Sequence, residues 1–570
     1  MYPLSASFFL KCPTLILHVS SQGKEQKLVT KISKNNTYNY PSLIPKKPTK
    51  NHKSLLTLIF KSLDDFVIKF LDSPLTPSID PDQLLSGNFF PVDELPPTAC
   101  EVVEGSLPRC LDGAYIRNGP NPQFISRRRP YHLFDGDGML HSIRISGGEA
   151  VFCSRYVKTY KFMTEGDKGY PFILSPFSSC NGVLATAARL VIDVARGVFG
   201  FYDPAANGLG TANTSVAFFG GSLYALAESD FPYKIAVDSN GEVVTLGRRV
   251  LCDGQKMTAH PHTDSETGET FAFRSNVFPP FLTFFSVDSA GIKRPDLPIF
   301  SIERRSCVHD FALTKRFVIF QDVQIEIDLM QVVRGRSPLV CDRERVPRIG
   351  VLPRHGGGDG DGGGAPITWI EAPGLNMMHV INAWECGDKI VILATNFLSL
   401  EFVQDINMFE SVFEMITLDM KEEKVVSRNV LCNKNMEFGV INEAYGGKKH
   451  KYMYAAVIAE MPKASGVAKL DLSIATAEGG DCTVASRAYG PGCYGGEPYF
   501  MAREPENPAS EEDDGYLVTY LHDENSMESW FLVMNAKSPT LEIVARVRLP
   551  GRVPYGFHGL FVREHHLKSL

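Results

Sequence analysis

The chain has 570 residues, of which 44% are hydrophobic and 11% aromatic, so it can bury a large core. This length exceeds one ordinary compact domain unless the architecture is a barrel or a propeller. The formal net charge of −7 and the pI near 6.1 argue against a nucleic-acid partner, which requires an excess of positive charge. The twelve cysteines include no Cys-x-x-Cys pair, so we expect reduced thiols instead of a zinc ribbon or a disulfide scaffold.

Residues 1–50 differ in composition from the rest of the chain. They are rich in Lys, Ser, Thr and Asn, and Glu25 is their one acidic residue. This composition is typical of a disordered organelle-targeting peptide, although such peptides are usually rich in Arg and this one contains Lys alone. An untargeted tail and a secretory signal are the alternatives. The apolar runs in this segment are too short to span a bilayer.

Two segments have the periodicity of amphipathic helices. From Leu55 to Leu71, apolar residues recur at steps of three and four, and a second stretch from Ala187 to Phe201 repeats the pattern. Such a helix can pack on the surface of its own domain, or it can lie in the plane of a membrane interface. Neither segment is long enough to cross a membrane.

From Ala114 to Phe561, short β-prone runs alternate with turn residues. Examples are Ser222–Leu226, Lys389–Leu393 and Leu517–Tyr520, with Gly, Asp, Asn or Pro between such runs. Short hairpin turns favour antiparallel meanders over parallel βαβ units, so we predict an all-β fold. A sandwich, a barrel and a propeller all fit this pattern. The length and the many meanders favour a propeller, although no repeat signature is visible.

Four isolated histidines have apolar or turn surroundings: His260, His309, His379 and His558. A buried imidazole needs a partner, and a metal ion is a candidate. Each of these residues alone is more often a core histidine bonded to a backbone carbonyl. We expect His450, beside two lysines, to be exposed to solvent. The context of four others leaves their role open: His132, His141, His262 and His522.

A series of motifs resembles the carotenoid cleavage dioxygenases. The series runs in order from about Pro91 to about Glu564, so its members together are far more specific than any one. It comprises Arg117–Pro122, Phe134–Met139, Ala259–Pro261, His309–Phe311, His379 with Asn382–Glu385, Tyr489–Phe500 and Tyr555–Gly559. With the plastid-like start, the chain most resembles the fourth plant class of this family.

The resemblance implies an all-β, seven-bladed propeller with a helical cap and an Fe(II) cofactor. The family holds its iron on the propeller axis with four histidines, here matched by His260, His309, His379 and His558. Three glutamates of the family accept the outward N–H of three of these ligands, and the matching residues are Glu228, Glu437 and Glu497. Many relatives have Pro after the Glu-Phe pair, where this chain has Gly439, which leaves the orientation of Glu437 to be tested.

The resemblance also implies an activity. Dioxygen and a carotenoid or apocarotenoid are the expected partners, the expected cleavage is at the 9,10 (9′,10′) bond, and no catalytic side chain is needed beyond the iron centre. Cleavage of epoxycarotenoids at the 11,12 bond and a non-enzymatic binding propeller are the alternatives. We expect a plastid protein at a membrane or plastoglobule surface, with a transit peptide over 1–50, an amphipathic segment over 51–90 and the propeller domain over 91–570.

Overall fold

The computed structural model describes residues 54–175, 177–228, 230–249, 256–355, 367–401, 405–475 and 479–569. The predicted targeting segment, residues 1–50, lies outside them. Antiparallel strands make up most of the described chain, and the β-prone runs identified in the sequence form strands. The ten cysteines within the described residues are free thiols.

Four separate four-stranded sheets follow one another along the middle of the chain. The first contains β5 (Ser215–Phe219), β6 (Ser222–Leu226), β7 (Tyr233–Val237) and β8 (Val243–Arg248), and the second contains β9 (His262–Thr263), β10 (Thr270–Ser275), β11 (Leu282–Val287) and β12 (Leu297–Ile299). The third contains β13 (Ala312–Leu313), β14 (Phe317–Asp322), β17 (Arg348–Pro353) and β18 (Thr368–Glu371). The fourth contains β19 (Met377–Cys386), β20 (Lys389–Phe397), β21 (Ser411–Asp419) and β22 (Lys424–Val430). Strands β15 (Ile325–Ile327) and β16 (Leu339–Cys341) form a separate hairpin.

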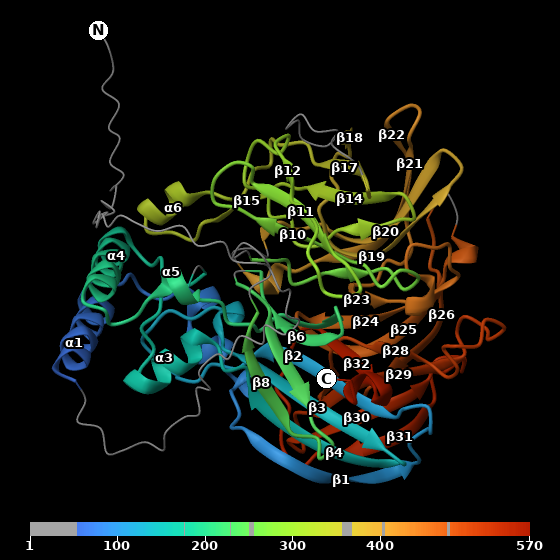
Figure 1. Cartoon of the computed structure of the whole chain (residues 1–570), viewed down its shortest axis with the longest axis horizontal. Helices are drawn as coiled ribbons and strands as arrows, with labels where there is room; N and C mark the ends of the chain where they lie inside the picture. The colour runs from blue at the N-terminus through green and yellow to red at the C-terminus, as the bar shows by residue number, and fades with distance from the viewer. Residues whose placement is uncertain are drawn as a thin grey trace, which may run out of the picture. The chain divides into compact units, whose positions relative to one another are not determined.

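A 14-stranded sheet contains the remaining strands and divides into groups of four, five and five. These groups are β23 (Met436–Val440), β24 (Tyr452–Glu460), β25 (Lys463–Asp471) and β26 (Thr483–Ala488); β27 (Cys493–Gly495), β28 (Tyr499–Ala502), β29 (Gly515–Asp523), β30 (Glu528–Asn535) and β31 (Ile543–Arg548); and β32 (Gly559–Arg563), β2 (Gly113–Pro120), β3 (Gly138–Ser146), β4 (Glu149–Tyr156) and β1 (Leu95–Gly105). With the four separate sheets they make seven blades, so the predicted seven-bladed β-propeller is confirmed (Figure 1).

The last blade joins strands from distant parts of the sequence. Strand β32 pairs antiparallel with β2, and the register sets Arg117 opposite Gly559. This pairing closes the ring, because the same blade continues through β3 and β4 to β1, and β1 pairs with β31 of the preceding blade.

Apolar side chains fill the space between neighbouring blades. Between the last two blades, the ring of Tyr115 lies 5.3 Å from that of Tyr520 and 5.7 Å from that of Phe531. Since a blade is covered on both faces, its middle strands are buried on both faces: in β29, every residue from Gly515 to His522 is buried. This explains why these strands are nearly continuous apolar runs in the sequence.

The innermost strand of each blade is an edge strand, and these edges meet around one axis. Strand β13 contacts β19, β19 contacts β23, β28 contacts β32, and β32 contacts β5. Residues at the beginnings of these strands are therefore brought together from all parts of the sequence.

The larger helices gather on one side of the strands (Figure 1). They are α1 (Leu55–Phe70), α3 (Tyr160–Lys168) and α4 (Val183–Val198), with the short α5 (Pro204–Asn207) beside them. Both amphipathic segments expected from the sequence are present, as α1 and α4, and the two helices pack on each other. Within the described part of the chain, no helix is long and apolar enough to cross a membrane.

Buried ion pairs tie α4 to α1. The guanidinium of Arg196 is fully buried and pairs with Asp64, while Arg189 lies 2.5 Å from Asp72. Burial raises the pKa of the Asp64 carboxyl although Arg196 opposes this shift. The pairing with Arg196 therefore offsets only part of the cost of burying the Asp64 carboxylate between the helices.

We expect Arg196→Met to lower the free energy of unfolding by about 3 kcal/mol or more, because it leaves a buried carboxylate unpaired. Lys61→Met is the matched control, since Lys61 lies 2.8 Å from Asp65 on the exposed face of α1 and its loss should cost less than about 0.5 kcal/mol. Thermal unfolding and hydrogen exchange of the α1 amides measure both variants. Equal effects of the two substitutions would contradict this account of the helix pair.

Candidate metal centre

The four histidines and three glutamates singled out in the sequence all lie at the inner ends of the blades, one residue for each blade. In blade order, Glu228 follows β6, His260 precedes β9, His309 precedes β13, His379 lies in β19, Glu437 lies in β23, Glu497 lies between β27 and β28, and His558 directly precedes β32. Residues up to 330 positions apart thus converge because each blade contributes its inner edge.

The four imidazole rings form one cluster. The Nε2 atoms of His309 and His379 are 3.2 Å apart, and one ring nitrogen each of His260, His309 and His379 lies within 4.8 Å of the other two. The ring of His558 lies outside this tight group of three, but its centroid is 4.6 Å from that of His260 and 5.1 Å from that of His379. The structure thus brings all four predicted histidines together.

Carboxylates hold the outer nitrogen of three of these rings. Nδ1 of His309 pairs with Glu228, and Nδ1 of His379 donates to Oε1 of Glu437 at 2.9 Å. Nδ1 of His558 donates to Glu497, also at 2.9 Å. With Nδ1 carrying the proton, Nε2 of each ring has a free lone pair facing the cluster.

Glu437 reaches His379 despite the glycine that follows its phenylalanine neighbour. Its second oxygen accepts the backbone N–H of Phe438, a residue held at a φ of 56°, and the carboxylate is completely buried. Gly439 leaves no room for a side chain, because an added Cβ would lie 2.6 Å from Ile381. The departure from the family pattern at Gly439 therefore leaves the orientation of Glu437 intact.

The fourth ring, that of His260, has no glutamate partner among the residues that the structure describes. Its Nε2 is buried and has no hydrogen-bond partner, while its backbone N–H donates to Oγ1 of Thr258 at 3.0 Å. An unpaired buried nitrogen costs about 1–3 kcal/mol, a cost that a metal ion bound to this lone pair would remove. The donor set, four clustered imidazoles of which His260 has an unpaired buried nitrogen, fits a transition-metal ion.

The electrostatics of the rings differ. Burial and the adjacent histidines, His309 first, hold the pKa of His260 well below its ordinary value. Burial also disfavours the charged form of His379, but Glu437 outweighs burial and raises the pKa of His379 to about 9. A cation bound by His379 replaces a proton, so metal affinity should increase as the pH rises toward that value.

A buried arginine fixes the loop that carries His558. Arg117 donates to the carbonyl of Pro554, and its guanidinium lies over the ring of Tyr520. A Cβ added to Gly556 would lie 2.8 Å from Nε of Arg117, so the glycine is required for this close approach. The loop is further held by Asn118, whose N–H donates to the His558 carbonyl at 3.0 Å.

Two residues near the cluster were not assigned a role from the sequence. Asp310, the neighbour of His309, accepts hydrogen bonds from Nε2 of His262 at 2.9 Å and from the backbone N–H of Val380 at 2.8 Å. Phe438 packs its buried ring against those of His379 and His558. Asp310 lies within the His309–Phe311 motif, and Phe438 directly follows Glu437. Their contacts join different blades, so no local sequence pattern indicates them.

The expectation that His450 is exposed is wrong. Only 6% of its surface is accessible, and its Nδ1 lies 2.9 Å from Nδ2 of Asn382, which also donates to two carbonyls of the same turn. Burial lowers its pKa to about 4, so the ring is neutral. Lys448 pairs with Glu266 at 2.9 Å on the surface, so a charged neighbour in the sequence does not indicate that the histidine is exposed.

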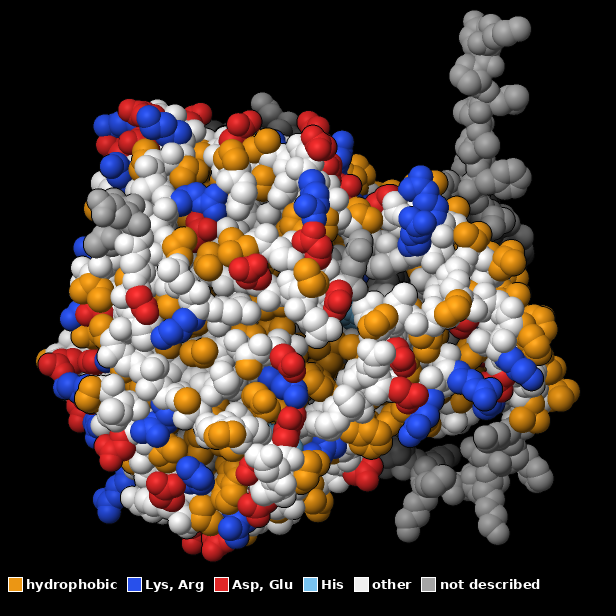
Figure 2. All heavy atoms as spheres, turned by 180° about the vertical axis from the view of Figure 1, so that it is seen from behind, with side chains coloured by type: hydrophobic (Ala, Val, Ile, Leu, Met, Phe, Trp, Pro, Cys, Tyr) orange, Lys and Arg blue, Asp and Glu red, His pale blue; other side chains and the backbone are white. Residues whose placement is uncertain are grey.

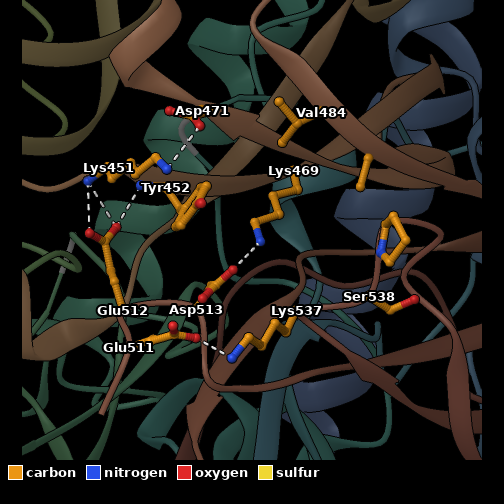
Figure 3. A pocket seen from close by; sticks show the side chains of 12 residues that line it. Lys451, Tyr452, Lys469, Asp471, Val484, Glu511, Glu512, Asp513, Lys537 and Ser538 are labelled. Carbon is orange, nitrogen blue, oxygen red and sulfur yellow. Dashed lines mark hydrogen bonds and ion pairs between the residues drawn. The ribbon is translucent and has the colours of Figure 1, made fainter. Parts of the chain in front are cut away.

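A separate cavity of about 620 Å³ shares no residue with the histidine cluster (Figure 3). Six of its seven charged side chains form ion pairs: Lys469 lies 2.5 Å from Asp513, Lys451 lies 3.4 Å from Asp471, and Lys537 pairs with Glu511. The seventh, Glu512, accepts the backbone N–H groups of Lys451 and Tyr452. Because three lysines face four carboxylates, most of the charge in the lining is compensated and the cavity offers little excess charge to a ligand.

A propeller whose axis carries four histidines, three of them backed by carboxylates, defines a metal-dependent enzyme of the non-haem type. Residues 89–563 match the model of the family described as retinal pigment epithelial membrane protein. The chain is 48% identical to the probable carotenoid cleavage dioxygenase 4, chloroplastic, of Arabidopsis thaliana, over 98% of this chain and 96% of that protein. The chain belongs to the carotenoid cleavage dioxygenase family, whose members are non-haem iron enzymes.

Two further comparisons agree. A chloroplastic 9-cis-epoxycarotenoid dioxygenase of Oryza sativa subsp. japonica is 49% identical, over 90% of this chain and 81% of that protein. The crystal structure of the lignostilbene dioxygenase of Pseudomonas brassicacearum superposes with a TM-score of 0.70 at 21% identity, covering 86% of this chain and 100% of that one. The structural likeness supports the propeller fold.

Proposed function

We propose that this protein is an iron(II)-dependent dioxygenase that cleaves a carotenoid or apocarotenoid at the 9,10 (9′,10′) double bond. The observation that carries the proposal is the cluster of His260, His309, His379 and His558, with its unpaired nitrogen on His260. The family membership and the 48% identity to a relative named as carotenoid cleavage dioxygenase 4 support the substrate class.

In this proposal the four histidines bind Fe(II), and Glu228, Glu437 and Glu497 fix the tautomer of three of them. Imidazole ligands suit iron, and iron held by these four residues would supply the activation of dioxygen for addition across a conjugated double bond, which gives two carbonyl products. The buried Phe438 ring packs beside His379 and His558 and gives one side of the cluster an apolar wall.

Cleavage of an epoxycarotenoid at the 11,12 bond is the second candidate. The relative from Oryza sativa, named for 9-cis-epoxycarotenoids, is as similar to this chain as the relative from Arabidopsis thaliana. Both activities use the same kind of iron site, so the histidine cluster does not separate them. The third alternative, a non-enzymatic binding propeller, is contradicted by the family membership.

We expect Glu437→Gln to weaken iron(II) or cobalt(II) binding about 10- to 100-fold, because the neutral amide no longer increases the basicity of His379. Glu385→Gln is the matched control. Glu385 lies in β19, the strand that contains His379, but at the opposite end. Its carboxylate accepts hydrogen bonds from Thr314 and Arg316 and contacts neither His309 nor His379. Anaerobic metal titration measures both affinities, and equal values for the two variants would rule out a role for Glu437 in metal binding.

Product analysis distinguishes the cleavage positions. We expect protein lacking residues 1–50, loaded with iron(II), to consume dioxygen and to release an ionone from β-carotene or its derivatives in detergent, as identified by mass. Activity without residues 1–50 is also expected if that segment is a removable transit peptide. Release of a shorter epoxy-aldehyde from an epoxycarotenoid would instead assign the 11,12 bond.

We also propose that the protein docks on a plastid membrane or plastoglobule surface through α1 and α4. On α4, Leu184, Val191 and Val198 are each at least 69% exposed. The short helix α6 (Leu329–Val333) extends this surface, since the backbone of Gly335 bonds that of Gly182 at the start of α4. Figure 2 shows the hydrophobic side chains gathered at the right-hand edge, over these helices. The plastid location is supported by the composition of residues 1–50 and by the chloroplastic relatives.

Replacing Leu184, Val191 and Val198 together by Ser is expected to reduce binding to vesicles of phosphatidylcholine and phosphatidylglycerol by about tenfold or more, because about 1.5–3 kcal/mol is gained for each such side chain that is fully buried. Val484→Ser is the control, since Val484 is exposed on β26, on the opposite side of the strands in Figure 1. Turnover of detergent-solubilised substrate should stay unchanged in both. Unaltered vesicle binding of the triple variant would disprove docking through α4.

A further inference from the structure

We propose that Asp310 is a positioning residue that holds in register the segments of three of the four histidines: His260, His309 and His379. Glutamates fix the rings of the other three histidines, whereas Asp310 fixes the position of His260 indirectly, by its hydrogen bond to His262. This inference rests on the proposed iron site. Nothing in the motif series assigned a role to either Asp310 or His262.

The two carboxylate oxygens of Asp310 accept three hydrogen bonds. Oδ1 accepts Nε2–H of His262 at 2.9 Å and the backbone N–H of Phe311 at 2.7 Å, and Oδ2 accepts the backbone N–H of Val380 at 2.8 Å. The three donors belong to three segments: His262 lies two residues after His260, Phe311 two residues after His309, and Val380 directly after His379. One buried side chain thus contacts the backbone or side chains of three blades.

The bonds to Asp310 hold two of these segments across large distances in sequence. His262 and Asp310 are 48 positions apart, and Asp310 and Val380 are 70 positions apart. Asp310 is only 4% exposed, so water competes little for its oxygens and each charge-assisted bond is strong. The ring of Phe311 packs edge-on against His262 at 4.8 Å and limits the rotation of that imidazole.

Neighbouring side chains strengthen the same junction. Oγ1 of Thr258 accepts the backbone N–H of His260 at 3.0 Å and lies 3.4 Å from the carbonyl of His309. The amide of Gln321 lies 3.4 Å from the carbonyls of both Asp310 and Met378, which flank His309 and His379. Asp310 is the charged member of this network, and it makes the shortest bonds in it.

The consequence concerns the geometry of the metal ligands. Among the described residues, no carboxylate bonds the ring of His260. The orientation of this ring therefore depends on the backbone of the segment His260–His262, which Asp310 holds at His262. If Asp310 releases His262 and Val380, the rings of His260 and His379 can shift relative to His309 while each blade stays folded. A metal site is sensitive to displacements of about 0.5 Å, so affinity and ligand field should change before stability does.

The test compares Asp310→Asn with Asp322→Asn in protein loaded with cobalt(II), whose visible absorption reports ligand geometry. Asp322 lies on β14 of the same blade, is fully buried and pairs with Arg345 and Arg348, but contacts no histidine segment. We expect Asp310→Asn to weaken cobalt(II) binding about 10- to 100-fold and to alter the absorption bands. Asp322→Asn should lower the unfolding temperature and leave both metal readouts unchanged.

Substitutions at His262 provide a second, independent measurement if Asp310→Asn does not fold. His262→Leu removes the donor and should reproduce the change in the cobalt(II) spectrum, whereas His262→Gln keeps an N–H donor and should restore most of the wild-type spectrum. Wild-type affinity and spectrum in both Asp310→Asn and His262→Leu would overturn the inference and leave the proposed function standing. Absence of cobalt(II) and iron(II) binding by the wild-type protein would overturn both.

Discussion

The pairing of β32 with β2 is the interaction on which the rest of the architecture depends. Each blade buries both faces against its neighbours, so an open ring would leave two apolar sheet faces exposed. Closing the ring joins strands more than 400 residues apart in sequence. The entropy cost of closing a loop grows only slowly with its length, so the burial of apolar surface can offset this cost. The same register places His558, directly before β32, on the axis beside His260.

The site uses the two nitrogens of imidazole for different purposes. In three of the rings the outer nitrogen bonds a carboxylate, while the inner nitrogen faces the other histidines of the cluster. Carboxylates buried at this depth are stable because each accepts several hydrogen bonds: Glu497 also accepts Gly559, and Asp310 accepts three donors. The blades therefore do more than surround the metal centre, since their backbone N–H groups determine where the charges lie.

Much of this was accessible from the sequence, for identifiable reasons. The periodicity of Leu55–Leu71 directly encodes a helix, and the ordered motif series singled out seven residues that the structure gathers at one axis. The four histidines alone do not predict a shared site, because their spacing in sequence does not indicate which strand edges lie together in the fold. Asp310 and His262 escaped assignment since their contacts link different blades. His450 was misjudged because its lysine neighbours suggested exposure, whereas Asn382, 68 positions away, buries it. The seven blades are not visible as a repeat in the sequence. The side chains on both faces of each blade fit its two neighbours, so they differ from one blade to the next.

Because each blade contributes one residue to the site, the seven residues of the site are synthesised in blade order. During synthesis Glu228 emerges first and His558 last, so six blades can be complete while the seventh still lacks its innermost strand. Until β32 pairs with β2, the other three histidines lack His558 as their neighbour. If the four histidines bind iron as proposed, the set of ligands is completed only at ring closure, so a chain that ends before His558 would keep most of its folded mass but lack the fourth ligand.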